Sequence, residues 1–178
     1  MTDRILEKFL IRQWEEGTKF AAASDVLALE PLDGPPPKNY IARFSCTGLV
    51  RSLSGEIVEA NEFVVGIGFH DGYLRAADPC RVLTWLWPRN VFHPNISDRA
   101  PFICVGHLVP GTSLVDILYQ CFEIITYHKV TMREDDALNK DACAWARQNQ
   151  HRFPIDPRPL KRRTVGSQVE PTGGPVGQ

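Results

Sequence analysis

The first hydrophobic run of the chain has helical spacing. One face of it carries Ile5, Leu6, Phe9, Leu10 and Trp14, three to five residues apart, and polar residues fill the positions between them. This pattern is typical of an amphipathic helix. Thr2 is a suitable N-cap and Gly17 a suitable C-terminal stop, so the sequence predicts a helix between these two residues.

Four segments rich in β-branched and aromatic residues follow, with partial alternation of apolar and polar positions. They are residues 25–32, 40–50, 62–69 and 80–87, and Pro88 ends the last of them. Residues 51–56 (RSLSGE) form a predicted hairpin loop or longer turn. Consecutive strands with short connections favour an antiparallel meander.

Helical spacing returns after Cys104. Residues 114–125 carry an apolar face, with Ser113 or Thr112 as the N-cap and Asp116 in the first turn. Residues 134–153 predict one further helix that Pro154 ends. Its expected inward residues are Ala137, Leu138, Ala142, Trp145 and Ala146. A helix, four strands and then two helices indicate an α+β fold with the helices segregated from an antiparallel sheet.

The composition and net charge of the chain argue against two classes of function, nucleic-acid binding and membrane association. The chain has 178 residues and a net charge of −1, which predicts one domain and no general attraction to nucleic acid or membrane. We expect a domain over residues 1–156 and a flexible tail rich in Pro and Gly over residues 157–178. The N-terminus lacks the pattern of a secretory signal, and no segment is apolar enough to span a bilayer.

The five cysteines are widely spread, with no CxxC pair and no repeated Cys/His spacing. Neither a disulfide framework nor a zinc site is favoured, and a reducing cytoplasm is the simplest compartment. No glycine-rich phosphate-binding loop occurs, so we expect no nucleotide and no other cofactor. Cys46, Cys121 and Cys143 lie on apolar faces and are predicted to be buried, whereas Cys80 stays undecided.

Two short motifs carry the candidate chemistry: FHPNI at residues 92–96 and FIC at residues 102–104. Together with the order of elements, they resemble the active-site segment of ubiquitin-conjugating enzymes. The resemblance covers roughly residues 3–153. It implies the fold of that family: an N-terminal helix, a four-stranded antiparallel meander, an irregular segment with the catalytic cysteine, and C-terminal helices.

The resemblance also implies roles for individual residues. Cys104 would carry a ubiquitin-like protein as a thioester, because a thiolate both attacks acyl groups and leaves well. Asn95 would stabilise the oxyanion as a lysine attacks, or only hold the loop, and both roles stay open. Asp136, with Asp135 as the alternative, would orient the incoming lysine, or serve only as an acidic first turn of the predicted helix. His93 and Pro94 are expected to be structural.

The resemblance further implies three protein partners: a ubiquitin-like protein, its activating enzyme and a target. Arg4, Lys8 and Arg12 repeat every four residues on the first helix and would contact the activating enzyme, although a solvated face is the simpler interpretation of such a stripe. The chain departs from the family in having one extra residue between Asn95 and Cys104 and GYLRAADP in place of a proline-rich stretch. It is therefore most similar to divergent members from bacterial ubiquitin-like conjugation operons, which are linked to antiphage defence.

Two other functions remain open. One is a non-catalytic adaptor of the same fold, which the presence of Cys104 argues against. The other is an unrelated thiol hydrolase that uses Cys104 with His93 or His107. Such a hydrolase needs an imidazole within hydrogen-bond reach of the sulfur, whereas a conjugating enzyme does not.

Overall fold

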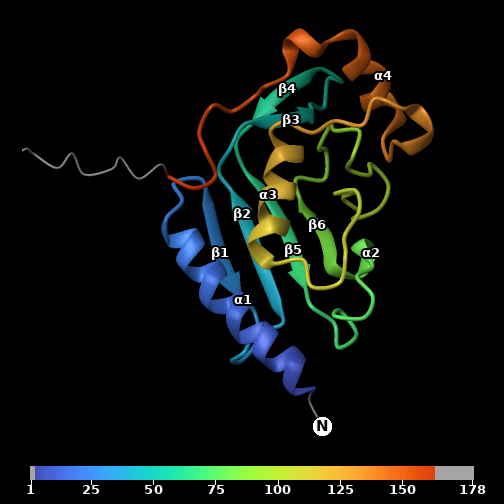
Figure 1. Cartoon of the computed structure of the whole chain (residues 1–178). Coiled ribbons are helices and arrows are strands. Elements are labelled where there is room, and N and C mark those ends of the chain that lie inside the picture. The colour runs from blue at the N-terminus through green and yellow to red at the C-terminus, as the bar shows by residue number, and fades with distance from the viewer. Residues whose placement is uncertain (1–2, 163–178) are drawn as a thin grey trace, which may run out of the picture.

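The computed structural model describes residues 3–162 and has an α+β fold (Figure 1). The main sheet contains β1 (Leu27–Pro31), β2 (Asn39–Phe44), β5 (Phe63–Gly68) and β6 (Leu83–Trp87) in that order. A separate hairpin contains β3 (Gly48–Arg51) and β4 (Ile57–Ala60). The α-helices are α1 (Arg4–Ala22), α2 (Pro79–Val82), α3 (Leu114–Ile125) and α4 (Lys140–Gln148). Two 3₁₀ turns are η1 (Glu134–Asp136) and η2 (Gln150–Arg152).

The expectation of a four-stranded antiparallel sheet behind an N-terminal helix is confirmed. Tyr40 pairs with Ile67 and Ala42 with Val65 across β2 and β5, so the inward positions of the two strands are in register. The predicted strand over residues 40–50 is instead two strands, because the chain leaves the sheet after Phe44 and enters the β3–β4 hairpin. The predicted strand over residues 80–87 begins with the single turn α2 before β6.

Helix α1 differs from its predicted limits at both ends. Asp3 caps it, because its carboxylate accepts a hydrogen bond of 2.9 Å from the Ile5 N–H, while Thr2 lies outside the described residues. The helix also continues through Gly17 to Ala22, so the prediction of a stop at Gly17 is wrong. A Cβ at Gly17 would come within 2.7 Å of the Leu114 side chain, so this glycine lets α1 approach α3 closely.

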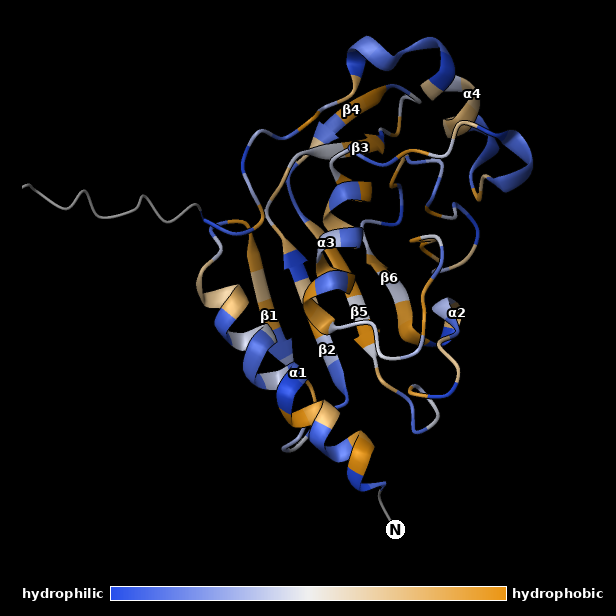
Figure 2. Cartoon of the chain, in the orientation of Figure 1, coloured by the Kyte–Doolittle hydropathy of each residue, from blue (hydrophilic) through white to orange (hydrophobic). Residues whose placement is uncertain are grey.

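The core lies between the helices and the main sheet. Helix α1 packs against α3 and β1, and α3 crosses in front of the sheet in Figure 1. Helix α3 buries Leu114, Ile117, Leu118 and Cys121 in the same core cluster as the inward residues of β2 and β5. Ser113 caps α3, as expected, by accepting from the Asp116 N–H. Hydrophilic and hydrophobic residues alternate along α1 (Figure 2), as an amphipathic helix requires.

The predicted continuous helix over residues 134–153 is wrong. Residues 134–136 form η1, the chain becomes extended at Ala137, and α4 begins only after its N-cap Asn139. The N–H groups of Leu138 and Asn139 both donate to the carbonyl of Pro94. Hydrogen bonds to a residue distant in the sequence therefore replace the backbone hydrogen bonds that a helix would make at these positions. Of the expected inward residues, Ala142 and Ala146 are buried and Leu138 is exposed.

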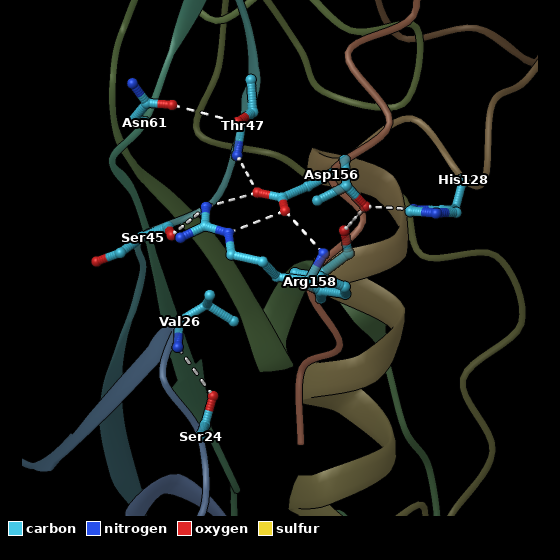
Figure 3. A network of polar contacts seen from close by, with 10 residues as sticks. Ser24, Val26, Ser45, Thr47, Asn61, His128, Asp156 and Arg158 are labelled. Carbon is cyan, nitrogen blue, oxygen red and sulfur yellow. Dashed lines mark hydrogen bonds and ion pairs between the residues drawn. The ribbon is translucent and has the colours of Figure 1, made fainter. Parts of the chain in front are cut away.

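Residues 153–162, which we name the C-terminal strap, run back along the molecule to the end of α1. In Figure 3 the carboxylate of Asp156 faces the guanidinium of Arg158 at 2.6 Å. The same carboxylate accepts a 2.9 Å bond from the Thr47 N–H, and Arg158 also donates to the Ser45 carbonyl at 3.0 Å. The network therefore ties the strap to the chain between β2 and β3.

The strap is also fixed at its far end. Leu160 is buried in the main core, and the Arg162 N–H donates to the Ala23 carbonyl at 3.0 Å. The sequence-based domain boundary after residue 156 falls within the strap, and residues 163–178 of the predicted tail lie outside the described residues. Among residues 3–162, no helix combines the length and the hydrophobicity needed to cross a bilayer.

Candidate functional site

The first half of the candidate site is a compact turn over residues 93–96. The Ile96 N–H donates to the His93 carbonyl at 3.1 Å, and the Asn95 N–H donates to Nδ1 of the His93 ring at 3.0 Å. Pro94 leaves its carbonyl free to accept from Leu138 and Asn139. The His-Pro-Asn sequence thus folds by local side-chain and backbone bonds, and the α4 region fastens it from outside.

The second half folds back onto the first. The Cys104 N–H donates to the Asn95 carbonyl at 2.8 Å, and Ile96 pairs with Ile103 as an isolated antiparallel bridge. The Ser97 N–H closes the loop by donating to the Phe102 carbonyl at 2.9 Å. Residues 97–102 therefore form the loop between the two halves, and Asn95 and Cys104 are direct backbone partners.

The Asn95 side chain holds this arrangement together, and we name the side chain with its two hydrogen bonds the clamp. It is 4 % exposed, its Nδ2 donates to the Cys104 carbonyl at 3.2 Å, and its Oδ1 accepts from the Thr131 N–H at 2.9 Å. One amide therefore joins the turn, the cysteine and the chain that follows α3. These bonds are those expected for the loop-holding role. We name residues 93–105 the Cys104 segment.

Cys104 is partly exposed, although its two neighbours along the chain are buried. Ile103 and Val105 on either side of it are 3 % and 1 % exposed. Cys46, Cys121 and Cys143 are fully buried, as predicted. Burial raises the pKa of the Cys46 and Cys121 thiols to about 12, which keeps them protonated and inert at neutral pH.

Cys80 is also exposed, but it lies in the single turn α2, where its N–H donates to the Asp78 side chain. Within the described residues, no amide or imidazole side chain bonds the backbone of Cys80 as Asn95 bonds that of Cys104. At Cys104, partial exposure thus coincides with a hydrogen bond from the Asn95 side chain to the backbone carbonyl of the cysteine.

Neither candidate histidine of the hydrolase hypothesis bonds the Cys104 sulfur. The Nδ1 atom of the His93 ring accepts a hydrogen bond from the Asn95 N–H, and its Nε2 is buried. Burial lowers the pKa of His93 to about 3, so the ring is neutral and structural, packed edge-on against Tyr127. His107 is exposed and makes no side-chain hydrogen bond within the described chain.

The two candidate acidic residues lie in η1, on the stretch that leads to the Pro94 contact. Asp136 is exposed and pairs with Nε of Arg133 at 3.4 Å. Only Ala137 separates it from Leu138, which bonds the Pro94 carbonyl. Asp135 is exposed as well. Both carboxylates are thus tethered near the His-Pro-Asn turn, through η1 rather than through the regular helix expected from the sequence.

The basic stripe of α1 is exposed, and Arg12 forms an ion pair with Glu16 at 2.8 Å. Arg4, Lys8 and Arg12 are therefore available to a partner on a surface separate from the Cys104 segment. The ion pair also fits the simpler interpretation of a solvated helix face.

Two residues at the site were not found from the sequence. Thr131 supplies the N–H that holds Asn95, and the Nζ of Lys129 donates to the Val105 carbonyl at 2.6 Å. Both follow α3, whose end is marked by Tyr127 in the left-handed region at φ 62°. No motif points to them, because a backbone donor and a surface lysine carry no distinctive pattern.

No family model matches the chain, and no curated protein matches its sequence. Within residues 3–162, no three His, Cys, Asp or Glu side chains gather as ligands for a metal ion.

Proposed function

We propose that the protein is a ubiquitin-conjugating-like enzyme with the fold of that family. It carries a ubiquitin-like protein as a thioester on Cys104 and transfers it to a lysine of a target. The observation that carries the proposal is the double connection between Asn95 and Cys104. Asn95 accepts the Cys104 N–H at 2.8 Å and its side chain donates to the Cys104 carbonyl at 3.2 Å.

Charging of the enzyme is a thioester exchange. The Cys104 thiolate attacks the carbonyl carbon of the thioester on the activating enzyme. A new C–S bond forms, the old C–S bond breaks, and the departing thiolate takes up the proton that Cys104 gave up. Arg4, Lys8 and Arg12 are the residues we assign to docking of the activating enzyme.

Transfer breaks the new thioester. A lysine amine attacks the carbonyl carbon, the Cys104 thiolate leaves, and the amine loses a proton. The Nδ2 group of Asn95 has two hydrogens, and Cys104 is its only acceptor within the described chain. We assign the second hydrogen to the oxyanion of the intermediate. Asp136 is assigned to orient the amine, with Asp135 as the alternative.

The biological setting follows from the resemblance alone. It is a bacterial ubiquitin-like conjugation pathway that serves antiphage defence, in which the partners are the modifier, its activating enzyme and the target. The cysteine pattern favours the cytoplasm as the compartment, and the sequence has no glycine-rich phosphate-binding loop, so we propose no cofactor on this chain.

Co-expression with the neighbouring genes, followed by intact-mass analysis without reducing agent, tests the proposal. We expect a thiol-sensitive adduct on the unmodified chain and on Cys80→Ala, the matched exposed cysteine. Cys104→Ala should form no adduct, and Cys104→Ser should form one that thiols do not cleave. An adduct that persists in Cys104→Ala would refute the assignment. Binding of the modifier without any adduct would favour the adaptor.

A further inference from the structure

Tyr127, just after α3, has a backbone conformation that bulky residues rarely adopt. Its φ of 62° lies in the left-handed region, and among the described residues it is the only one other than glycine with a positive φ. In this region the Cβ crowds the backbone, so glycine or asparagine is usual and a tyrosine is strained. The contacts of the Tyr127 side chain must therefore offset a strain that glycine would avoid.

The Tyr127 side chain supports the chain where it enters the His-Pro-Asn turn. It is 2 % exposed, and its hydroxyl donates to the carbonyl of Phe92. Its ring packs edge-on against the His93 ring, with the two ring centroids 4.3 Å apart. Burial raises the pKa of Tyr127, so the hydroxyl stays protonated and remains a donor. Because the His93 ring accepts the Asn95 N–H, Tyr127 is linked to Asn95 through His93.

This support belongs to a small hydrophobic cluster that is separate from the main core. The buried members of the cluster come from β3, from the chain before the turn, from the end of α3 and from α4: Leu49, Phe92, Tyr127 and Ala142. Ile125, the last residue of α3, belongs to the main core. Tyr127 therefore connects the helix that is fixed in the main core to the cluster that holds the turn.

The left-handed turn at Tyr127 also directs the following residues along the Cys104 segment. The Nζ of Lys129 donates to the Val105 carbonyl at 2.6 Å, and the Thr131 N–H donates to the Asn95 side chain at 2.9 Å. Together with Tyr127, these residues contact the Cys104 segment at both of its ends and at the clamp. The direction in which the chain leaves α3 is therefore a condition for all of these contacts.

We propose that Tyr127 is a positioning residue for acyl transfer at Cys104. It holds the Phe92 carbonyl and the His93 ring, and it thereby fixes the turn that presents the Asn95 amide to the thioester. The inference rests on the proposed function, since it needs an acyl group on Cys104. A displacement of about 1 Å at such a site can slow a reaction by about a hundredfold, so the loss of one hydroxyl should be visible in the rate of transfer.

Tyr73 provides a matched control for the Tyr127 hydroxyl. It is also a buried tyrosine, and its hydroxyl donates to the Thr112 carbonyl at 2.8 Å, but it lies in the main core and not in the cluster behind the turn. Tyr127→Phe and Tyr73→Phe each remove one hydroxyl and leave one backbone carbonyl without that donor. We therefore expect comparable losses of thermal stability in the two variants.

A small acyl donor measures transfer without the modifier or its activating enzyme. The full chain is charged on Cys104 with a thioester of N-acetyl-diglycine, in a Cys80→Ala background that removes the other accessible thiol of the described residues. Discharge by free lysine is followed by intact mass at a temperature where every variant is folded, and hydrolysis without lysine is subtracted. Tyr127→Phe should discharge about tenfold more slowly than the background chain, and Tyr73→Phe within about twofold of it.

Hydrogen exchange supplies a second measurement at the turn. The Asn95 N–H, which donates to the His93 ring, should exchange at least about tenfold faster in Tyr127→Phe and at an unchanged rate in Tyr73→Phe. A role in general stability alone would not produce this difference between two variants of comparable stability.

The outcomes separate the inference from the proposed function. Discharge of Tyr127→Phe at the rate of the background chain overturns the inference and leaves the proposed function standing. An equal slowing in Tyr73→Phe also overturns the inference, because the hydroxyl would then act only through the stability of the fold. A chain that is never charged on Cys104, or whose thioester lysine does not discharge, overturns both.

Discussion

The Cys104 segment and the C-terminal strap are both irregular stretches fastened to the fold by side-chain contacts, but they are fastened differently. The strap relies on a charged pair, Asp156 with Arg158 at 2.6 Å, whose carboxylate also satisfies the Thr47 N–H. In the Cys104 segment, the neutral amide of Asn95 makes a single bond to each of two backbone groups, and the Lys129 ammonium donates to the Val105 carbonyl.

This difference separates a structural device from a candidate reactive one. In the strap, both oxygens of the Asp156 carboxylate are bonded to other groups of the described chain, and Leu160 is buried in the core. In the Cys104 segment, the clamp uses backbone atoms and leaves the Cys104 sulfur partly exposed. Because the Asn95 amide is uncharged, the charge around Cys104 depends on Lys129 and on any bound partner.

The largest expected effect on stability belongs to the strap. Asp156→Ala leaves the Thr47 N–H without its acceptor and Arg158 without its partner, and we expect it to lower the free energy of unfolding by about 3 kcal/mol. Urea denaturation measures this. Asp156→Asn keeps an acceptor of the same shape and should cost about half as much. Equal losses in the two variants would show that the charge adds nothing to the strap.

The second effect is a pH dependence that distinguishes the two regions. Burial lowers the pKa of His93 to about 3 from an ordinary value of 6.5. Between these values the unfolded chain binds a proton that the folded chain does not, so stability is unaffected above pH 6.5 and falls as the pH drops towards 3. The loss at pH 4.5 should be about 2–3 kcal/mol.

Unfolding measured between pH 7 and 4.5 checks this dependence. His93→Asn keeps an acceptor for the Asn95 N–H and should flatten the slope by about one proton, while the exposed His107→Asn should not. The contribution of the strap to stability changes at a lower pH than that of His93. The Arg158 guanidinium holds the pKa of Asp156 below its ordinary value of 3.8, so its contribution is complete above that pH and is lost below it. An unchanged slope in His93→Asn would place the acid sensitivity elsewhere.

The third effect concerns the clamp itself. Asn95→Ala removes one donor and one acceptor from a buried position, and we expect it to cost about 1–2 kcal/mol. Hydrogen exchange at the Thr131 N–H should become faster at the same time. If exchange at Thr131 stays as slow as before, Asn95 does not hold the chain after α3.

The smallest effect is at the outer end of the strap. Arg162 pairs with Asp25 at 2.8 Å, but both side chains are more than half exposed. Arg162→Met should therefore change the free energy of unfolding by less than about 0.5 kcal/mol, because its backbone bond to Ala23 persists. A loss as large as that of Asp156→Asn would mean that the strap is held mainly from its end.

The periodicity of the sequence was sufficient to predict the α+β class, α1, α3 and the main sheet. Predictions from the sequence were wrong where a contact between residues distant in the sequence outweighed the local sequence signal. Gly17 signals a helix stop, yet α1 continues because the missing side chain makes room for Leu114. The helix predicted over residues 134–153 breaks at Ala137, because the next two N–H groups bond the Pro94 carbonyl.

The candidate site was predictable in its motif residues and not in its supports. The His-Pro-Asn turn and Cys104 can be recognised in the amino-acid sequence. The structure adds that the Cys104 N–H donates a hydrogen bond to the Asn95 carbonyl. Thr131 contributes a backbone N–H, which every non-proline residue has, so only the fold reveals it. Residues 157–162 of the strap were expected to belong to a flexible tail, since their Pro-rich composition hides the buried Leu160.

The most direct measurement is the rate at which the Cys104 thioester is lost to added free lysine, compared between Asn95→Ala and Arg158→Met while both are folded. If the clamp is part of an acyl-transfer site and the strap is only structural, Asn95→Ala should still be charged but discharge about a hundredfold more slowly. Arg158→Met should discharge within about twofold of the unmodified chain. Discharge of Asn95→Ala at the unmodified rate, or an equal slowing in Arg158→Met, would contradict the account.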